Sequence, residues 1–234
     1  MEQHLHIAGH AVTLRYKRVK NINMRLTPTA AQPTGEVCIS APRHVSMQQI
    51  VDFVTAKSDW LAKQQRKLAA HPPPKALVYE EGEMHALWGQ AYALQLAYVN
   101  RGQGVDFDGT NWRMRVRAKA SIEKKAALFE TAYQNLLVQT ARPLMAQWAA
   151  IMDVQPQGLK TQKMKSRWGS CHVGKRVIKL NSELARKPMP LLEYVLVHEL
   201  VHFFGRGHNA RFYDLMSRYL PDWQTRKAQL NGLS

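Results

Sequence analysis

His198-Glu199-Leu200-Val201-His202, followed by Gly205 and His208, is the segment that decides the fold of this 234-residue chain. On an α-helix, side chains four positions apart lie on the same face, one turn from each other. The imidazoles of His198 and His202 can therefore bind one Zn²⁺ ion, with Glu199 beside the open coordination position. His208 supplies a third ligand and leaves the fourth position free, which is typical of catalytic zinc sites.

The sequence around this motif favours a helix that ends in a turn. Residues 191–197 are mainly apolar, and Pro190 suits the first helical turn because its missing N–H group is not needed there. Gly205 and Gly207 let the chain leave the helix and turn back, so that His208 approaches the other two histidines. The alternative is a core helix with incidental histidines, and the position of His208 argues against it.

The spacing from His198 to His208 also matches the pattern of the metzincins, which carry a methionine turn well downstream of the motif. Only 26 residues follow His208. Met216 is the only methionine among them, and it lies in a segment that reads as a helix. We therefore do not assign the metzincin fold.

Composition limits the class of protein. A hydrophobic content of 45% supports a core for one large domain or two small ones. No stretch is long and apolar enough to span a bilayer, and residues 1–6 lack the build of a signal peptide. Cys38 and Cys171 lie far apart, which argues against a disulfide scaffold and fits a reducing compartment. We expect a cytoplasmic protein without a membrane partner; the oligomeric state is not indicated.

The net charge of +16 favours anionic partners. Nine cations and one acid, Glu183, lie in the segment just before the zinc motif: Lys160, Lys163, Lys165, Arg167, Lys175, Arg176, Lys179, Arg186 and Lys187. We expect an anionic or polypeptide substrate. Contact with nucleic acid or a nucleotide through the basic surface is a further prediction, and a surface that only serves solubility is the alternative.

Residues 1–117 are predicted to form a strand-rich α+β region with one helix. Alternating apolar residues indicate strands within 10–40, 87–98 and 112–116, and the glycine-rich segment 102–109 reads as a turn.

The helix of this region should begin at a capping box. Ser46 and Gln49 have the spacing of such a box, and apolar residues at helical spacing continue to near Ala70. The prolines at 72–74 should stop the helix and form a stiff spacer.

Residues 118–234 are predicted to form the metallohydrolase domain. A long helix over 121–151 should be kinked or broken by Pro143. A short strand over 177–180 precedes the zinc helix, and a further helix runs from Asn209 to about Leu220. In zinc peptidases a strand beside the metal helix often offers its edge to an extended substrate.

The chain resembles the YgjP-like metal-dependent hydrolases, which are close to the SprT and WLM zinc peptidases. The resemblance is carried by Arg167-Trp168-Gly169-Ser170-Cys171, Leu180-Asn181, Pro188, Tyr194-Val195, the HExxH motif, His208 and Phe212. Nearer the amino terminus, residues 35–42, Asp59-Trp60-Leu61 and residues 82–96 are also similar to this family. A longer insertion around 100–111 departs from the pattern.

The resemblance implies an α+β fold with a zincin-like catalytic module of helices and a small sheet. Carried over by position, it makes His198, His202 and His208 the ligands of one zinc ion and Glu199 the general base. It also implies that the Arg167–Cys171 motif lies near the site. Arg167 would stabilise developing negative charge or hold an anionic substrate, with a structural salt bridge as the alternative.

Three other side chains are weighed for the same site. Cys171 is close to it in sequence, and we expect a buried, inert thiol there. Tyr213 and Tyr219 are candidates to polarise a substrate carbonyl.

Three functions remain open at this stage. The first is a zinc metallopeptidase. The second is a nucleoside triphosphate pyrophosphatase acting on UTP, an activity with which members of this family have been associated, although polyphosphate chemistry usually uses carboxylate-bound Mg²⁺. The third is a DNA-associated protease like the SprT relatives, although no aromatic-interleaved basic motif is present.

Overall fold

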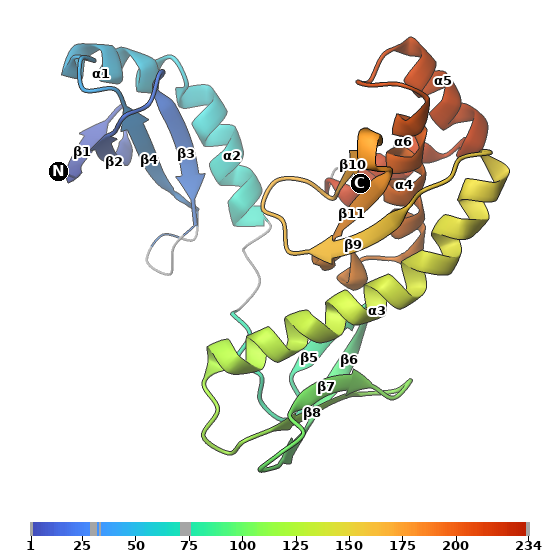
Figure 1. Cartoon of the computed structure of the whole chain (residues 1–234). Coiled ribbons are helices and arrows are strands. Elements are labelled where there is room, and N and C mark those ends of the chain that lie inside the picture. The colour runs from blue at the N-terminus through green and yellow to red at the C-terminus, as the bar shows by residue number, and fades with distance from the viewer. Residues whose placement is uncertain (1, 29–31, 33, 71–75, 233–234) are drawn as a thin grey trace. The chain divides into compact units, whose positions relative to one another are not determined.

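The computed structural model describes residues 2–28, 32, 34–70 and 76–232. Over these residues it is α+β, as predicted, with six α-helices and three small sheets (Figure 1). The chain divides into two compact units, Met1–Ala76 and Leu77–Ser234. The predicted proline spacer at 72–74 lies outside the described residues.

The first unit is a four-stranded sheet with helices on one face. Its strand order is β1-β2-β4-β3, in which β2 and β4 are parallel and the other pairs are antiparallel. The strands are β1 (Glu2–Ile7), β2 (His10–Tyr16), β3 (Asn23–Thr27) and β4 (Glu36–Ala41). Alternate residues such as Val12 and Ile39 are buried against Ile50, Val54 and Leu61 of the helices. The predicted strands over 10–40 are confirmed.

The single helix predicted up to Ala70 is two helices, α1 (Met47–Thr55) and α2 (Ser58–Ala70). The predicted capping box is present, because Gln49 N–H donates to Ser46 Oγ and Ser46 N–H donates to Gln49 Oε1. The break comes where Lys57 N–H donates to Val54 O, three residues back instead of four. Apolar residues of α1 and α2 face the same core. The helical spacing of apolar residues therefore continues across the break, and the sequence pattern does not reveal that there are two helices.

The second unit begins with a sheet of order β5-β6-β8-β7. Its strands are β5 (Met84–Leu87), β6 (Gln90–Tyr98), β7 (Gly104–Phe107) and β8 (Trp112–Val116). The glycine-rich segment predicted as a turn therefore contains strand β7. Gly89, in the β5–β6 turn, has a φ of +84°, and a Cβ there would lie 2.7 Å from Pro188 Cγ. This glycine lets the sheet approach the segment that leads into the HExxH helix.

The predicted boundary at 117 does not separate two packed units. The β5–β8 sheet packs on helix α3 (Ile122–Ile151), with the ring centroids of Trp112 and Phe129 5.0 Å apart and those of Trp112 and Tyr133 5.1 Å apart. Tyr133 Oη donates to Ala86 O at 2.8 Å. The strands after residue 76 and the carboxy-terminal half share one core, so the division falls at 76/77 instead.

Helix α3 runs between the β5–β8 sheet and the elements that carry the HExxH motif (Figure 1). It is continuous through Pro143, so the predicted break is absent. The other side of α3 packs on β9 and α4, and Trp148 Nε1 donates to Glu193 Oε1 at 3.1 Å. The long helix therefore ties the two halves of this unit into one body.

The remaining elements form a small sheet and three helices. The sheet order is β10-β11-β9, with β9 (Gly158–Gln162), β10 (Gly169–His172) and β11 (Val177–Asn181). The helices are α4 (Met189–Val201), α5 (Ala210–Tyr219) and α6 (Trp223–Leu230). The strand predicted over 177–180 is confirmed as β11, but it is the central strand, so β10 provides the free edge beside α4.

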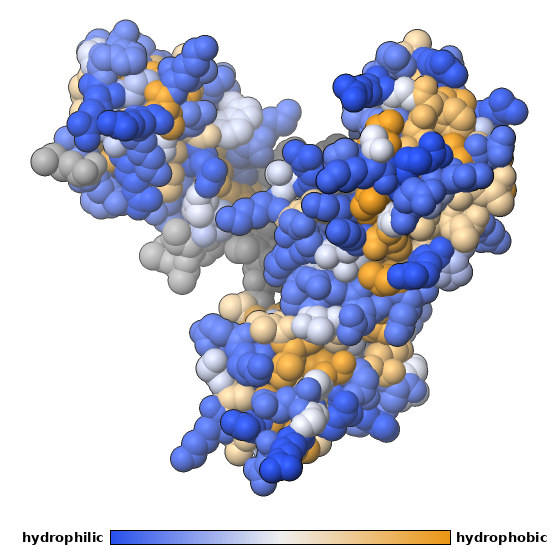
Figure 2. Space-filling model, in the orientation of Figure 1, coloured by the Kyte–Doolittle hydropathy of each residue, from blue (hydrophilic) through white to orange (hydrophobic). Residues whose placement is uncertain are grey.

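Hydrophilic side chains cover most of the visible face of each unit (Figure 2). Among the described helices, none combines the length and the apolar composition that a bilayer crossing needs.

Replacing Pro143 by Ala is expected to stabilise the protein. Pro143 is exposed within α3 and has no N–H group to donate to the preceding turn. Alanine restores that hydrogen bond, and we expect the free energy of unfolding in urea to rise by about 1–3 kcal/mol. The control Gln147→Ala, exposed one turn later, should change it by less than about 0.5 kcal/mol. An unchanged or lower stability of Pro143→Ala contradicts this description of α3.

Candidate metal centre

The HExxH motif lies on α4, the most deeply buried helix near the site. Pro188 is the residue before the helix and Pro190 lies in its first turn, where the missing N–H group costs no hydrogen bond, as predicted. Leu192, Leu196 and Leu200 are fully buried, and six further residues of the helix are buried as well. A helix with so few exposed residues belongs in a core. The core therefore fixes the backbone that carries His198 and Glu199.

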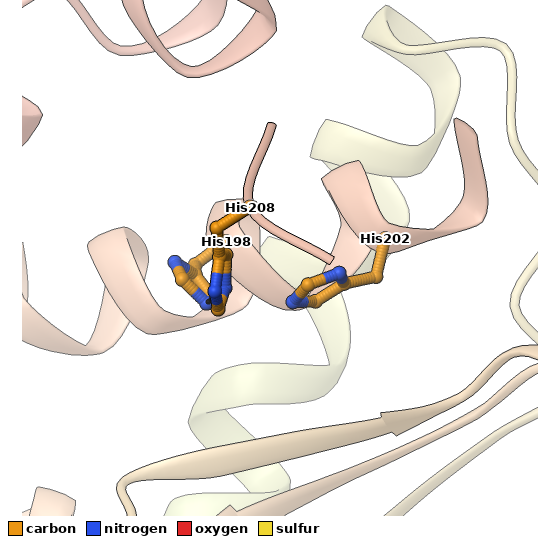
Figure 3. Close-up of side chains that lie close together, drawn as sticks. All are labelled: His198, His202 and His208. Carbon is orange, nitrogen blue, oxygen red and sulfur yellow. Dashed lines mark hydrogen bonds between the residues drawn. The ribbon is translucent and has the colours of Figure 1, made fainter. Parts of the chain in front are cut away.

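The three predicted ligands converge on one point. Their ligating nitrogens all lie within 4.8 Å of one another, and His198 Nε2 lies 3.1 Å from His208 Nε2 (Figure 3). His202 stands at the end of α4, where the chain tightens into a 3₁₀ turn. The chain then returns through Gly207, which has a φ of +80°, and brings His208 onto the other two rings.

Phe212 and Asn209 support the returning segment. Phe212 is buried, and its ring centroid lies 4.5–4.9 Å from those of all three histidines. The side chain of Asn209 accepts a hydrogen bond from Phe212 N–H at 3.0 Å and so caps α5. Helix α5 thus holds the Phe212 ring against the three imidazoles, and this contact restricts the rotation of the imidazoles.

The electrostatic surroundings of His198 and His202 favour the neutral imidazole. Burial, followed by the charges of His202 and His208, lowers the pKa of His198 to about 3. Burial and the charge of His208 also lower the pKa of His202. A neutral imidazole is the form that binds metal. Tetrahedral zinc with bonds of about 2.0–2.1 Å keeps its ligand nitrogens about 3.3 Å apart, so the three rings fit such an ion after small side-chain shifts.

Glu199 is buried beside the three rings, with 5% of its surface exposed. Burial raises the pKa of its carboxyl group to about 8, and the charge of Arg167 acts in the opposite direction. The backbone of β10 lies directly against this carboxylate. A Cβ atom on Gly169 would lie 2.6 Å from Glu199 Oε1 and 2.9 Å from Val195 Cγ1. Only glycine permits this approach of the edge strand to the helix.

A cleft of about 660 Å³ opens above these groups. Its walls are β10 with the residues just before it, α4, the segment that carries His208, and the end of α6. His198, Glu199, His202 and His208 all line it, and so does Arg167, as the resemblance implied. The edge of β10 therefore forms one side of the cleft that contains the three histidines.

The other predicted side chains differ in their positions. Cys171 lines the cleft half-buried, and burial, followed by the charge of Glu199, raises the pKa of its thiol to about 11, which favours the inert, protonated form. Tyr213 stacks on Trp223 at 5.5 Å and on His208 at 6.5 Å, outside the lining of the cleft. Tyr219 stacks on Phe204, also outside it.

Three cleft residues were missed in the sequence. Tyr194 lies one turn before His198 on the same face of α4, and its ring centroid is 5.9 Å from that of His198. Burial, followed by the charge of Glu199, raises the pKa of Tyr194 to about 12. Its spacing of four residues could have revealed it. Arg206 and Lys227 carried no such signal, because they reach the cleft from the loop after His202 and from α6, a helix that was not predicted.

The chain belongs to the YgjP-like family, whose metallopeptidase-domain model matches residues 23–233. The family places the chain among metal-dependent hydrolases, as the resemblance implied. No curated protein has a significant sequence match to it.

Two solved structures of metallopeptidase zymogens are similar to part of the chain. Abylysin of Pyrococcus abyssi is 16% identical over 38% of this chain and 90% of its own, with a TM-score of 0.36. Jannalysin of Methanocaldococcus jannaschii is 16% identical over 39% of this chain and 93% of its own, with a TM-score of 0.36.

Replacing Gly169 by Ala is expected to disturb the contact between β10 and α4. The added Cβ would overlap Glu199 and Val195, so we expect the free energy of unfolding to fall by about 1–3 kcal/mol. The control is Gly174→Ala in the same hairpin, where the nearest atom, His172 Cε1, is 3.7 Å away. That change should cost less than about 0.5 kcal/mol. Equal stability of the two variants in urea would show that the close approach at Gly169 is not required.

Proposed function

We propose that the protein is a zinc metallopeptidase in which His198, His202 and His208 hold one zinc ion. The observation that supports this most is the convergence of three imidazoles beside a buried carboxylate, in a cleft bordered by the edge of strand β10. Three imidazoles suit zinc better than magnesium, which prefers oxygen ligands. A three-residue ligand set also leaves one position for the reaction.

Glu199 is the general base of this proposal. It takes a proton from the attacking water as the new C–O bond forms, and it passes that proton to the amine nitrogen as the C–N bond breaks. Bound zinc would act as a Lewis acid in this reaction and lower the pKa of the attacking water. The burial of Glu199 and its contact with the β10 backbone hold the carboxylate in a fixed position.

Strand β10 positions the substrate backbone. Its inner edge pairs with β11, from Gly169 opposite Leu180 to His172 opposite Val177. In the described part of the chain its outer edge has no strand partner. An extended peptide adds to such an edge through main-chain hydrogen bonds, which do not depend on its side chains. The peptide bond to be cleaved then lies along the wall of the cleft that faces Glu199.

Replacing Glu199 by Gln is expected to lower kcat for peptide cleavage by about 10²–10⁴-fold, because the amide cannot accept the proton. The zinc content should stay the same as in the wild type, because the three histidines are unchanged. The control Asp214→Asn removes an exposed carboxylate from α5 and should leave kcat unchanged. Peptide cleavage by the zinc-loaded Glu199→Gln protein at the wild-type rate would contradict the assignment of the base.

A nucleoside triphosphate such as UTP is the alternative substrate. The cations Arg167, Arg206 and Lys227 in the cleft favour an anionic ligand. The imidazole ligands count against it, because enzymes that act on polyphosphates usually bind Mg²⁺ through carboxylates. A panel of peptides and nucleoside triphosphates, offered to the zinc-loaded protein, separates the two. Release of pyrophosphate from UTP without cleavage of any peptide would replace the peptidase proposal.

A second candidate function is contact with nucleic acid through the first unit, as in a DNA-associated protease. Four exposed cations, Lys17, Arg18, Lys20 and Arg43, lie in the loops after β2 and β4. These loops are neighbours, because Lys17 N–H donates to Ala41 O at 2.9 Å. Helix α1 begins at the same place and has no acidic residue in its first turn. We propose that this end of the sheet binds a phosphate backbone.

Replacing Lys17, Arg18 and Lys20 by Gln is expected to weaken the binding of labelled single-stranded DNA, measured by fluorescence anisotropy. The slope of log K against log salt should fall by about 2, because up to three phosphate contacts are lost. The matched control replaces Lys57, Lys63 and Arg66 on and beside α2, with the same change in charge. Equal effects of the two triple variants, or no binding by the wild type, would exclude this surface.

A further inference from the structure

Three cations line the cleft from three separate elements. Arg167 precedes β10, Arg206 lies in the loop between His202 and His208, and Lys227 lies on α6. All three side chains are exposed. Glu199 is the only carboxylate among the described residues that line the cleft, and it is buried. The wall of the cleft therefore carries an excess of positive charge.

The ion pairs of α6 are formed by Arg226. Glu193 and Asp222 both bind Arg226, at 2.5 and 2.8 Å. Lys227 is the next residue, yet no ion pair is found for it within the described part of the chain; its Nζ lies 5.7 Å from the centre of the Trp223 ring. Arg226 therefore ties α6 to α4 through its ion pair with Glu193. The neighbouring Lys227 lines the cleft, where its ammonium group can bind a ligand.

The cations that precede α4 in the sequence show a similar contrast. Glu183 binds Lys163 at 3.3 Å and Arg186 at 3.5 Å. In the ranges that the structure describes, neither Arg167 nor Arg206 forms an ion pair with a carboxylate.

These cations share the cleft with the groups that would carry out the reaction. Arg167 and Lys227 line the same cleft as His198 and Glu199, on the β10 side and on the α6 side. A concave site lined by one sign of charge concentrates ligands of the opposite sign.

We propose that the cleft selects peptides that carry aspartate or glutamate within about three residues of the cleaved bond. This inference rests on the proposed peptidase function. Arg167, Arg206 and Lys227 lie on three separate elements around the cleft and do not form one cluster. This separation suits carboxylates that are spaced along an extended peptide. A peptide on the β10 edge would extend its side chains from this wall toward Arg167 and Lys227.

Binding tests the proposal apart from catalysis. The zinc-loaded Glu199→Gln protein is titrated into two labelled peptide pools of the same length, one with Asp and Glu at the varied positions and one with Asn and Gln. We expect the acidic pool to bind about 3- to 10-fold more tightly, with an advantage that shrinks as salt is added. Lys227→Gln in the same background should remove most of that advantage.

The matched control is Lys160→Gln on β9, the opposite edge strand of the same sheet, which should leave the preference unchanged. Equal binding of the two pools, or a preference that Lys227→Gln and Arg167→Gln both leave intact, overturns the proposal. So does tight binding of UTP that no acidic peptide displaces.

Cleavage of the same pools by the zinc-loaded wild type separates this inference from the function on which it rests. Cleaved products enriched in Asp or Glu near the new termini are the expected result. Cleavage without that enrichment overturns the acidic preference and leaves the peptidase function standing. No cleavage of either pool overturns the peptidase function.

Discussion

The structure depends on holding three imidazoles together without a compensating charge of its own. Protonated, these rings would repel one another within a space of 4.8 Å, and burial adds a further cost to any charge there. The lowered pKa of His198 expresses both effects. The fold holds three imidazole nitrogens that face a common point. A divalent cation at that point supplies the charge that the site lacks, which is the physical reason for regarding it as a metal centre.

The second constraint is the contact between a strand and a helix. Gly169 allows the backbone of β10 to reach the carboxylate of Glu199, and the free edge of β10 then borders the cleft. A single position without a side chain therefore links the residue proposed as the base to the surface proposed to bind the peptide. Helix α3 supports this contact, because it packs on both α4 and β9, which belongs to the same sheet as β10. The extended core that includes β5–β8 explains why no domain boundary falls at 117.

Local patterns in the sequence predicted the parts of the fold that depend on neighbouring residues. The HExxH spacing, the proline in the first turn of α4, the capping box at Ser46 and the alternation within 10–40 all gave elements that the structure contains. The errors arose where tertiary packing decides. Helix α3 continues through Pro143 because that residue is exposed and its neighbours are held by packing on two sides. The break between α1 and α2 was hidden because both helices face one core.

The same distinction applies to the site. The three histidines and Glu199 could be found from spacing alone, and Tyr194 shares that spacing. Arg206 and Lys227 come from a loop and from a helix that had no sequence signal, so only the folded chain brings them to the cleft. The choice of β11 as the substrate-binding edge failed for a similar reason, since the position of a strand within a sheet is a long-range property.

X-ray absorption at the zinc edge of the purified, zinc-loaded protein tests the central claim most directly. The account predicts one zinc ion per chain with three imidazole nitrogens at about 2.0–2.1 Å and a remaining light-atom ligand. It also predicts that the nitrogen signal changes in His208→Ala, because that ring closes the site. A zinc ion with sulfur at about 2.3 Å, or a spectrum that His208→Ala leaves unchanged, would contradict it.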